Sequence, residues 1–284
     1  MCNTCGCNLT DGNRHLLLAP AYPKKQREVS AEAVLHGLLD QNDRQARSNR
    51  EILDAHGILV INLMSSPGAG KTTLLETTIK ALQARWRIGV IEGDLETEND
   101  AMRIRAHGVP VVQITTGTAC HLDAHLLAPA LAQMPLEQLD ILFVENVGNL
   151  VCPASFDLGH HLNVTLLSFA EGDDKPAKYP VMFRAADLLL ITKQDLQPYM
   201  DDFSPDRAEA CLRQLASDAP LIILSGRSGM GMDAWLAWLD EQLARHRASL
   251  ARGESTRPRV ERAGRILHHP AEVVFRAVRT HDAH

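Results

Sequence analysis

The residues best suited to do chemistry form a glycine-rich run, SSPGAGKT, at positions 65–72. An apolar stretch precedes the run and a helix-forming stretch follows it, which predicts a strand, a tight turn and a helix start. The N–H groups of such a turn and the positive end of the helix converge on one point and bind phosphate. We therefore predict a phosphate-binding loop in which Lys71 reaches the β- and γ-phosphates and the Thr72 hydroxyl binds Mg²⁺. The residues expected to contact the nucleotide here are Ser66, Gly68, Ala69, Gly70, Lys71, Thr72 and Thr73.

Two acidic motifs, EGD at 92–94 and ENVG at 145–148, each end an apolar run. Asp94 is expected near Mg²⁺ and the γ-phosphate, and the Gly148 N–H is expected to sense loss of that phosphate on hydrolysis. Lys71 would stabilise charge on the transferred phosphoryl group. Either Asp94 or Glu145 would position the attacking water or the coordination shell of Mg²⁺. The sequence does not choose between these two carboxylates.

A base-binding element follows the apolar run 188–191. Residues 192–195, TKQD, are similar to the N-K-x-D element that selects guanine, although Thr192 replaces the asparagine and puts the support of the local loop in doubt. The Asp195 carboxylate would accept from two N–H donors of guanine, a pair that adenine lacks, while the Lys193 stem lies along the base. The nucleotide is therefore expected to be GTP. The residues expected to close over the base are Ser225, Gly226 and Arg227.

Three cysteines at the start of the chain form a C-x-x-C-x-C cluster: Cys2, Cys5 and Cys7. The three cysteines are too close in sequence for disulfides between them to cross-link a core, but their thiolates can surround one soft metal ion. Zinc, cuprous copper and nickel all suit such ligands, so this cluster alone does not identify the metal.

A second candidate metal site combines adjacent Cys120 and His121, at the start of an expected helix, with Cys152. Two thiolates and an imidazole leave a fourth coordination position open. Because Cys152 follows Gly148 by four residues, we expect nucleotide state to change the geometry of these ligands. The other histidines considered, His125, His160 and His161, are expected to be surface or structural residues.

Strand-length apolar runs alternate with helical patterns along the chain, which predicts an α/β fold with a mostly parallel sheet covered by helices. The motifs above fall at the carboxyl ends of the strands, where such sheets bind ligands. The predicted strands are 58–64, 88–91, 109–114, 141–144, 164–169, 188–191 and 221–224. The predicted helices are 31–55, 73–85, 99–107, 121–133, 206–217 and 232–245.

Three segments are predicted in the 284 residues: a flexible metal-binding arm at 1–29, a nucleotide domain with an N-terminal helix at 30–245, and an arginine-rich solvated tail at 246–284. The formal net charge is −6, and because the tail is basic, the body is more acidic still. An acidic body argues against general nucleic-acid binding. No apolar run approaches the roughly 20 residues of a membrane span, and no signal peptide is recognisable, so we expect a cytoplasmic protein with reduced thiols.

These motifs together resemble the HypB family of GTPases, which help to insert nickel into NiFe hydrogenase. The resemblance covers residues 50–245 and the N-terminal cysteines, and it includes two runs that are not general GTPase features, EGDDKP at 171–176 and KYPVMF at 178–183. It implies a P-loop NTPase fold, slow GTP hydrolysis, a GTP-bound homodimer, nickel or zinc at the Cys120 site, and tight nickel binding by the N-terminal cysteines. The implied partners are a HypA-like nickel-binding protein and the hydrogenase large-subunit precursor.

The sequence therefore favours a GTPase in which loss of the γ-phosphate moves Cys152, lowers nickel affinity and releases the ion to a partner. One alternative is a GTPase chaperone for another nickel enzyme, such as urease. Another is a metal storage or sensor protein that nucleotide merely stabilises. A small-molecule kinase is less favoured, because Lys193 and Asp195 favour guanine and no acceptor pocket is evident.

Overall fold

The computed structural model describes residues 31–94, 98–215 and 217–258, with side chains from Leu39 onward. The predictions for Cys2, Cys5 and Cys7, and for the tail beyond Pro258, lie outside these residues. No helix within the described ranges combines the length and the apolar character that crossing a membrane requires.

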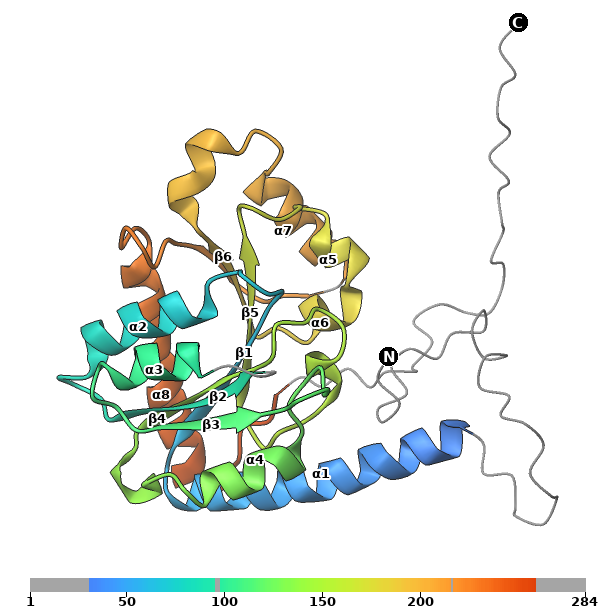
Figure 1. Cartoon of the computed structure of the whole chain (residues 1–284), viewed down its shortest axis with the longest axis vertical. Helices are drawn as coiled ribbons and strands as arrows, with labels where there is room; N and C mark the ends of the chain where they lie inside the picture. Colours follow the sequence, from blue (N-terminus) through green and yellow to red (C-terminus); the bar gives the residue numbers. More distant parts are fainter. Residues whose placement is uncertain (1–30, 95–97, 216, 259–284) are drawn as a thin grey trace, which may run out of the picture.

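Seven strands form one sheet in the order β3-β2-β4-β1-β5-β6-β7 (Figure 1). Every pair of neighbouring strands is parallel, which confirms the predicted sheet. The central strands are buried along their whole length, as expected for a parallel sheet covered on both faces. The strands are β1 Leu59–Met64, β2 Ile88–Asp94, β3 Val111–Thr115, β4 Ile141–Glu145, β5 Leu162–Ser168, β6 Leu188–Thr192 and β7 Leu221–Ile223.

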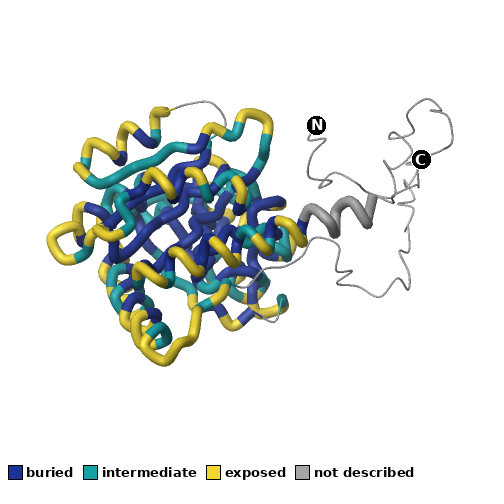
Figure 2. Tube along the Cα trace, turned by 90° about the horizontal axis from the view of Figure 1, so that it is seen from below, coloured by how far each residue is buried: buried dark blue, intermediate teal, exposed yellow. Residues whose placement is uncertain are grey.

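Helices cover both faces of the sheet, and successive side chains of β1 point alternately to one face and to the other. Leu59, Ile61 and Leu63 pack with α2, α3 and α8, whereas Val60 packs with α1 and α4 and Met64 packs with α6 and α7. Figure 2 shows the result, a buried interior inside helices whose outer sides are exposed. The helices are α1 Ala31–Ala55, α2 Lys71–Leu82, α3 Asn99–Arg105, α4 Ala124–Leu131, α5 Lys175–Lys178, α6 Pro180–Arg184, α7 Pro205–Gln214 and α8 Met232–Ala251.

The last helix is longer than predicted. The sequence pattern ended it at Arg245, but α8 continues to Ala251 because its next turns still contact the body. His246 is only 2% exposed, and Arg247 forms an ion pair with Asp140 at 2.7 Å. Residues 246–251 therefore belong to the folded domain and not to a solvated tail.

The fourth helix starts later than predicted. Asp123 caps it by accepting a hydrogen bond from the Leu126 N–H at 2.7 Å, so α4 begins at Ala124. Cys120 and His121 consequently lie in the loop before the helix, not at its start.

Candidate nucleotide and metal sites

The turn between β1 and α2 has the backbone of a phosphate-binding loop. Gly68 and Gly70 have φ angles of 75° and 95°, a region that glycine adopts without strain. Lys71 starts α2, and its ammonium donates to the Ser65 hydroxyl oxygen at 3.0 Å. The Ser66 hydroxyl donates to a carboxylate oxygen of Glu171, which ties this turn to the segment after β5. The local sequence thus builds the turn that its glycines predict.

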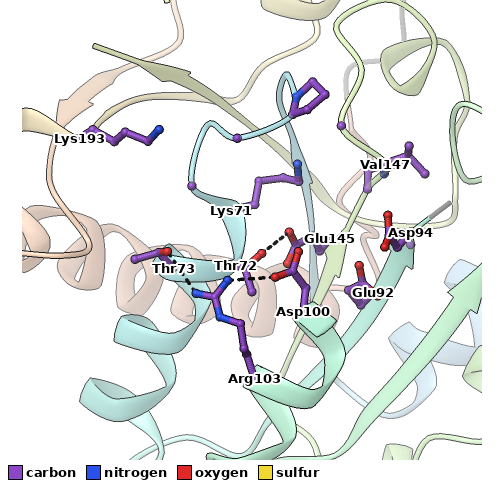
Figure 3. Close-up of a pocket in the computed structure, with 16 residues that line it drawn as sticks. Lys71, Thr72, Thr73, Glu92, Asp94, Asp100, Arg103, Glu145, Val147 and Lys193 are labelled. Carbon is purple, nitrogen blue, oxygen red and sulfur yellow. Dashed lines mark hydrogen bonds and ion pairs between the residues drawn. The ribbon is translucent and has the colours of Figure 1, made fainter. Parts of the chain in front are cut away.

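A cavity of about 450 Å³ opens above this turn and brings the predicted phosphate and magnesium residues together (Figure 3). The Thr72 hydroxyl donates to Glu145 at 2.9 Å, and Asp94 lines the same cavity from the end of β2. Hydroxyl and carboxylate oxygens are the ligands that Mg²⁺ prefers, so this donor set fits the ion. The predicted residues that line the cavity are Gly68, Gly70, Lys71, Thr72, Thr73, Asp94, Glu145, Gly148 and Lys193.

Glu92 also lines this cavity, although the sequence analysis did not select it. It lies opposite Glu145 on the neighbouring strand, and the two side chains are 2% and 4% exposed. Burial, with Glu145 nearby, raises the pKa of Glu92 to about 8. Burial raises the pKa of Glu145 to about 7, against the opposing effects of Lys71 and Thr72. A carboxylate inside an apolar strand was the sequence signal that could have identified Glu92.

A second cavity, of about 430 Å³, adjoins the first and is lined by the predicted base-binding residues. Asp195 accepts a hydrogen bond from the Ser225 hydroxyl at 2.5 Å, and Lys193 lines both cavities. The Thr192 hydroxyl donates to the Ala69 carbonyl oxygen at 2.7 Å, so this residue still supports the loop in the absence of an asparagine. The other predicted residues that line this cavity are Ala69, Gly70, Thr73, Gly226 and Arg227.

The second candidate metal site is brought together from two loops. The ligand atoms of Cys120, His121 and Cys152 all lie within 4.8 Å of one another, and the two sulfur atoms are 3.2 Å apart. His121 stacks on Phe156 with 4.0 Å between ring centroids, and burial lowers its pKa. Its ring is therefore neutral at physiological pH, the form that binds metal.

Two asparagines connect this cluster to the nucleotide cavity, and the sequence analysis missed both. Asn146 follows β4, and its side-chain oxygen accepts from the Leu122 N–H at 3.1 Å. The Asn149 side-chain amide donates to the Cys120 carbonyl oxygen at 3.2 Å. Both contacts join residues that are far apart in the sequence, so no local motif predicts them. The loop 145–152 thus contacts the phosphate-binding residues at one end and supplies Cys152 at the other.

The ligand atoms of a further group, Asp54, His161 and His246, also lie within 4.8 Å of one another, near the amino ends of β1 and β5. The Nδ1 atom of His161 accepts the Val60 N–H at 2.9 Å, so its Nε2 atom bears the proton and donates to Asp54 at 3.0 Å. A metal-bound histidine instead donates its second N–H, so this arrangement disfavours a metal.

The remaining histidines behave as the sequence predicted. His160 and His161 are 1% and 0% exposed and serve as buried structural residues, whereas His125 is exposed on α4.

The parallel sheet, the phosphate-binding turn and the two adjoining cavities define a P-loop nucleotide-binding protein. The family model described as CobW/HypB/UreG, nucleotide-binding domain, matches residues 59–222. The chain belongs to the HypB family of hydrogenase maturation factors.

Individual relatives agree with this assignment. The hydrogenase maturation factor HypB of Escherichia coli K12 is 52% identical over 205 residues, which cover 72% of this chain and 70% of that protein. The hydrogenase/urease maturation factor HypB of Helicobacter hepaticus is 48% identical, over 76% of this chain and 87% of its own. The crystal structure of HypB from Helicobacter pylori in complex with nickel has a TM-score of 0.69 and 40% identity, and covers 72% of this chain and 96% of that one.

Proposed function

We propose that this chain is a GTP-hydrolysing nickel metallochaperone that delivers nickel to the NiFe hydrogenase precursor, with nickel affinity set by nucleotide state. Membership of the HypB family and the nickel complex of the Helicobacter pylori relative support the metal and the pathway. Asp195, paired with Ser225 in the second cavity, supports guanine as the base.

The single observation that carries the coupling is the loop 145–152. Glu145, at its start, accepts a hydrogen bond from Thr72, and Cys152, at its end, lies 3.2 Å from Cys120. Gly148, between them, is packed against Pro67 of the phosphate-binding turn. A γ-phosphate that displaces this segment would therefore displace one of the two thiolates. We propose that hydrolysis reverses the displacement, lowers nickel affinity and releases the ion.

The catalytic roles proposed from the sequence are retained. Lys71 stabilises charge on the transferred phosphoryl group, Thr72 and Asp94 hold Mg²⁺, and Glu145 or Asp94 positions water. When bound, Mg²⁺ supplies positive charge to the transferred phosphoryl group. Zinc is a second candidate ion for the Cys120 cluster, because two thiolates and an imidazole suit it.

The assembly proposed around this domain has three parts. Cys2, Cys5 and Cys7 bind nickel on the arm at 1–29, the GTP-bound protein is a homodimer, and nickel passes between a HypA-like protein and the hydrogenase precursor. The protein acts in the cytoplasm, where GTP is available. The tail after α8 has no proposed role.

The test is a nickel titration with GDP and with a non-hydrolysable GTP analogue. The N-terminal cysteines are replaced by alanine in every sample, so that only the second site is counted. We expect one site whose affinity differs between nucleotides and which is lost in Cys120→Ala/Cys152→Ala. Cys211→Ala is the matched control, because this thiol lies on α7 and outside the cluster. Equal nickel affinity with both nucleotides would contradict the coupling.

One alternative has specific support, because the Helicobacter hepaticus relative is named a hydrogenase/urease maturation factor. The same GTPase switch would then serve another nickel enzyme. Which nickel-enzyme precursor co-purifies with the GTP-bound protein distinguishes the two. A nucleotide-stabilised storage or sensor protein predicts equal affinity in the titration above.

A further inference from the structure

Two buried carboxylates face each other across adjacent strands at the floor of the nucleotide cavity. Glu92 on β2 is the register partner of Glu145 on β4. Both side chains are more than nine-tenths buried, and both line the cavity beside Lys71 and Thr72. Figure 3 shows them on the same side of the cavity as Asp94 and Asp100.

The hydrogen bonds around this pair are incomplete. One oxygen of Glu145 accepts from the Thr72 hydroxyl, but the Oε2 atoms of Glu145 and Glu92 have no hydrogen-bond partner among the described residues. The Lys71 ammonium donates to Ser65 instead. A buried acceptor without a donor is costly, and two neighbouring buried carboxylates to which no cation donates a hydrogen bond are costlier still.

A hydrated divalent cation meets both requirements. Mg²⁺ keeps several of its water molecules in protein sites, and those waters donate hydrogen bonds to nearby carboxylates. Thr72 and Asp94, the proposed ligands, line the same cavity as Glu92. We propose that Glu92 is a positioning residue for Mg²⁺ and that its carboxylate accepts hydrogen bonds from the water shell of the ion. This inference rests on the proposed GTPase function and adds a residue to its magnesium site.

Glu92 is held in the sheet by a strand on each side, whereas Asp94 is held by a strand on one side. Asp94 ends β2 and pairs only with Thr115 of β3, whereas Glu92 lies inside the strand and pairs with both β3 and β4. A side chain on a paired strand keeps its position whether or not the loops respond to nucleotide. Glu92 should therefore retain Mg²⁺ with GDP as well as with GTP.

The test replaces Glu92 by glutamine, which has the same shape but cannot be ionised, and measures GDP dissociation while Mg²⁺ is varied. We expect the Mg²⁺ concentration for half-maximal GDP retention to rise at least tenfold in Glu92→Gln. GDP affinity in EDTA should be unchanged, because Glu92 acts on the nucleotide only through the ion. Direct Mn²⁺ binding, followed by electron paramagnetic resonance, should weaken in parallel.

Asp100→Asn is the matched control, because Asp100 lines the same cavity but already pairs with Arg103 at 3.0 Å. Its Mg²⁺ requirement should stay within twofold of the wild type. If Glu92→Gln needs the same Mg²⁺ concentration as the wild type for half-maximal GDP retention, the inference is overturned. Glu92 would then have only a structural role. If Glu92→Gln does not fold, Glu92→Asp supplies the measurement: it retains the charge but shortens the side chain, so its requirement should rise too, and an unchanged value overturns the inference.

Failure of the proposed function gives a different result. A wild-type protein that binds no guanine nucleotide, with or without Mg²⁺, contradicts the GTPase proposal. A wild-type protein that binds Mg²⁺·GDP, together with a Glu92→Gln variant that binds it equally well, contradicts only the role of Glu92.

Discussion

Asn149 holds Cys120 in place through a hydrogen bond from its side-chain amide to the Cys120 carbonyl oxygen, at 3.2 Å. The backbone N–H of the same asparagine donates to the Ser65 carbonyl oxygen at 2.8 Å. Ser65 in turn accepts a hydrogen bond from Lys71, the residue proposed to bind phosphate. A short chain of contacts therefore joins Lys71 to the loop that carries Cys120. Cys152 lies in the same loop as Asn149, so both thiols depend on residues 145–152.

Substitution of Asn149 should weaken the dependence of nickel affinity on nucleotide. In Asn149→Ala, Cys120 no longer follows the loop, so the ratio of nickel affinities with GTP analogue and with GDP should fall toward one. GDP affinity itself should change less than threefold, because the backbone bond to Ser65 remains. Nickel titrations with each nucleotide provide the measurement.

The control for this prediction is Val151→Ala, since Val151 is half exposed in the same loop and its side chain has no polar contact to lose. This variant should keep the wild-type ratio. If nickel affinity in Asn149→Ala falls equally with both nucleotides, Asn149 has a structural role only.

Gly148 should not tolerate even one added methyl group. A Cβ atom there would lie 2.9 Å from the backbone N and Cα atoms of Pro67, too close for either segment to stay in place. Gly148→Ala should lower GDP affinity at least tenfold and the free energy of unfolding by about 1–3 kcal/mol, as overpacking does. Calorimetry and urea unfolding measure the two effects. Gly108→Ala adds a methyl group with no atom within 4 Å; its φ of 77° strains alanine and should lower stability, but GDP affinity should be unchanged. An equal loss of GDP affinity there would contradict the steric explanation.

Thr192 should contribute to nucleotide affinity but not to the choice of base. Thr192→Val removes the hydrogen bond to Ala69, worth about 1 kcal/mol, so GDP should bind about fivefold more weakly. The preference for GDP over ADP should persist because Asp195 is unchanged. Thr165→Val is the control, since the buried Thr165 hydroxyl has no hydrogen-bond partner among the described residues. A loss of base preference in Thr192→Val would show that Thr192 does more than hold the loop.

Acid should destabilise the domain through its buried histidines. Burial lowers the pKa of His160 to about 4, while the unfolded chain binds the proton near its ordinary pKa of about 6.5. The unfolded state therefore holds more protons below pH 6.5, and stability falls as pH falls toward 4. His160 alone should cost about 2 kcal/mol between pH 7 and pH 5, measured by urea unfolding.

His160→Gln isolates this effect, because it should remove much of the stability loss between pH 7 and pH 5. His125→Gln, at an exposed position, should not. Equal slopes for the wild type and His160→Gln would show that other groups cause the acid sensitivity.

The sequence predicted the sheet well, because each strand contains a short apolar run that needs no tertiary information to be recognised. The phosphate-binding turn was equally readable, since Gly68 and Gly70 fill positions that other residues avoid. Glu92 and Asn149 were missed for a physical reason. Glu92 follows an apolar run, a position that predicts the start of a loop. The hydrogen-bond partners of Asn149 lie 29 and 84 residues away along the chain, where no local pattern indicates them.

Helix ends were predicted less well than helix positions. The helix was expected to end at Arg245, yet Arg247 forms an ion pair with Asp140 and His246 packs on His161. Only the folded arrangement of α8 beside the loops before β4 and β5 reveals those partners. The start of α4 depended on Asp123, a capping residue that the helical pattern alone did not separate from its neighbours.

The loop 145–152 also imposes a thermodynamic symmetry. If GTP changes nickel affinity by some factor through this loop, nickel must change GTP affinity by the same factor, because the two binding free energies are linked around one closed cycle. The two thiols that would hold the ion lie 3.2 Å apart, and one of them, Cys152, belongs to this segment. Metal binding would then change the affinity for nucleotide, so the metal cargo would itself influence the timing of its own release.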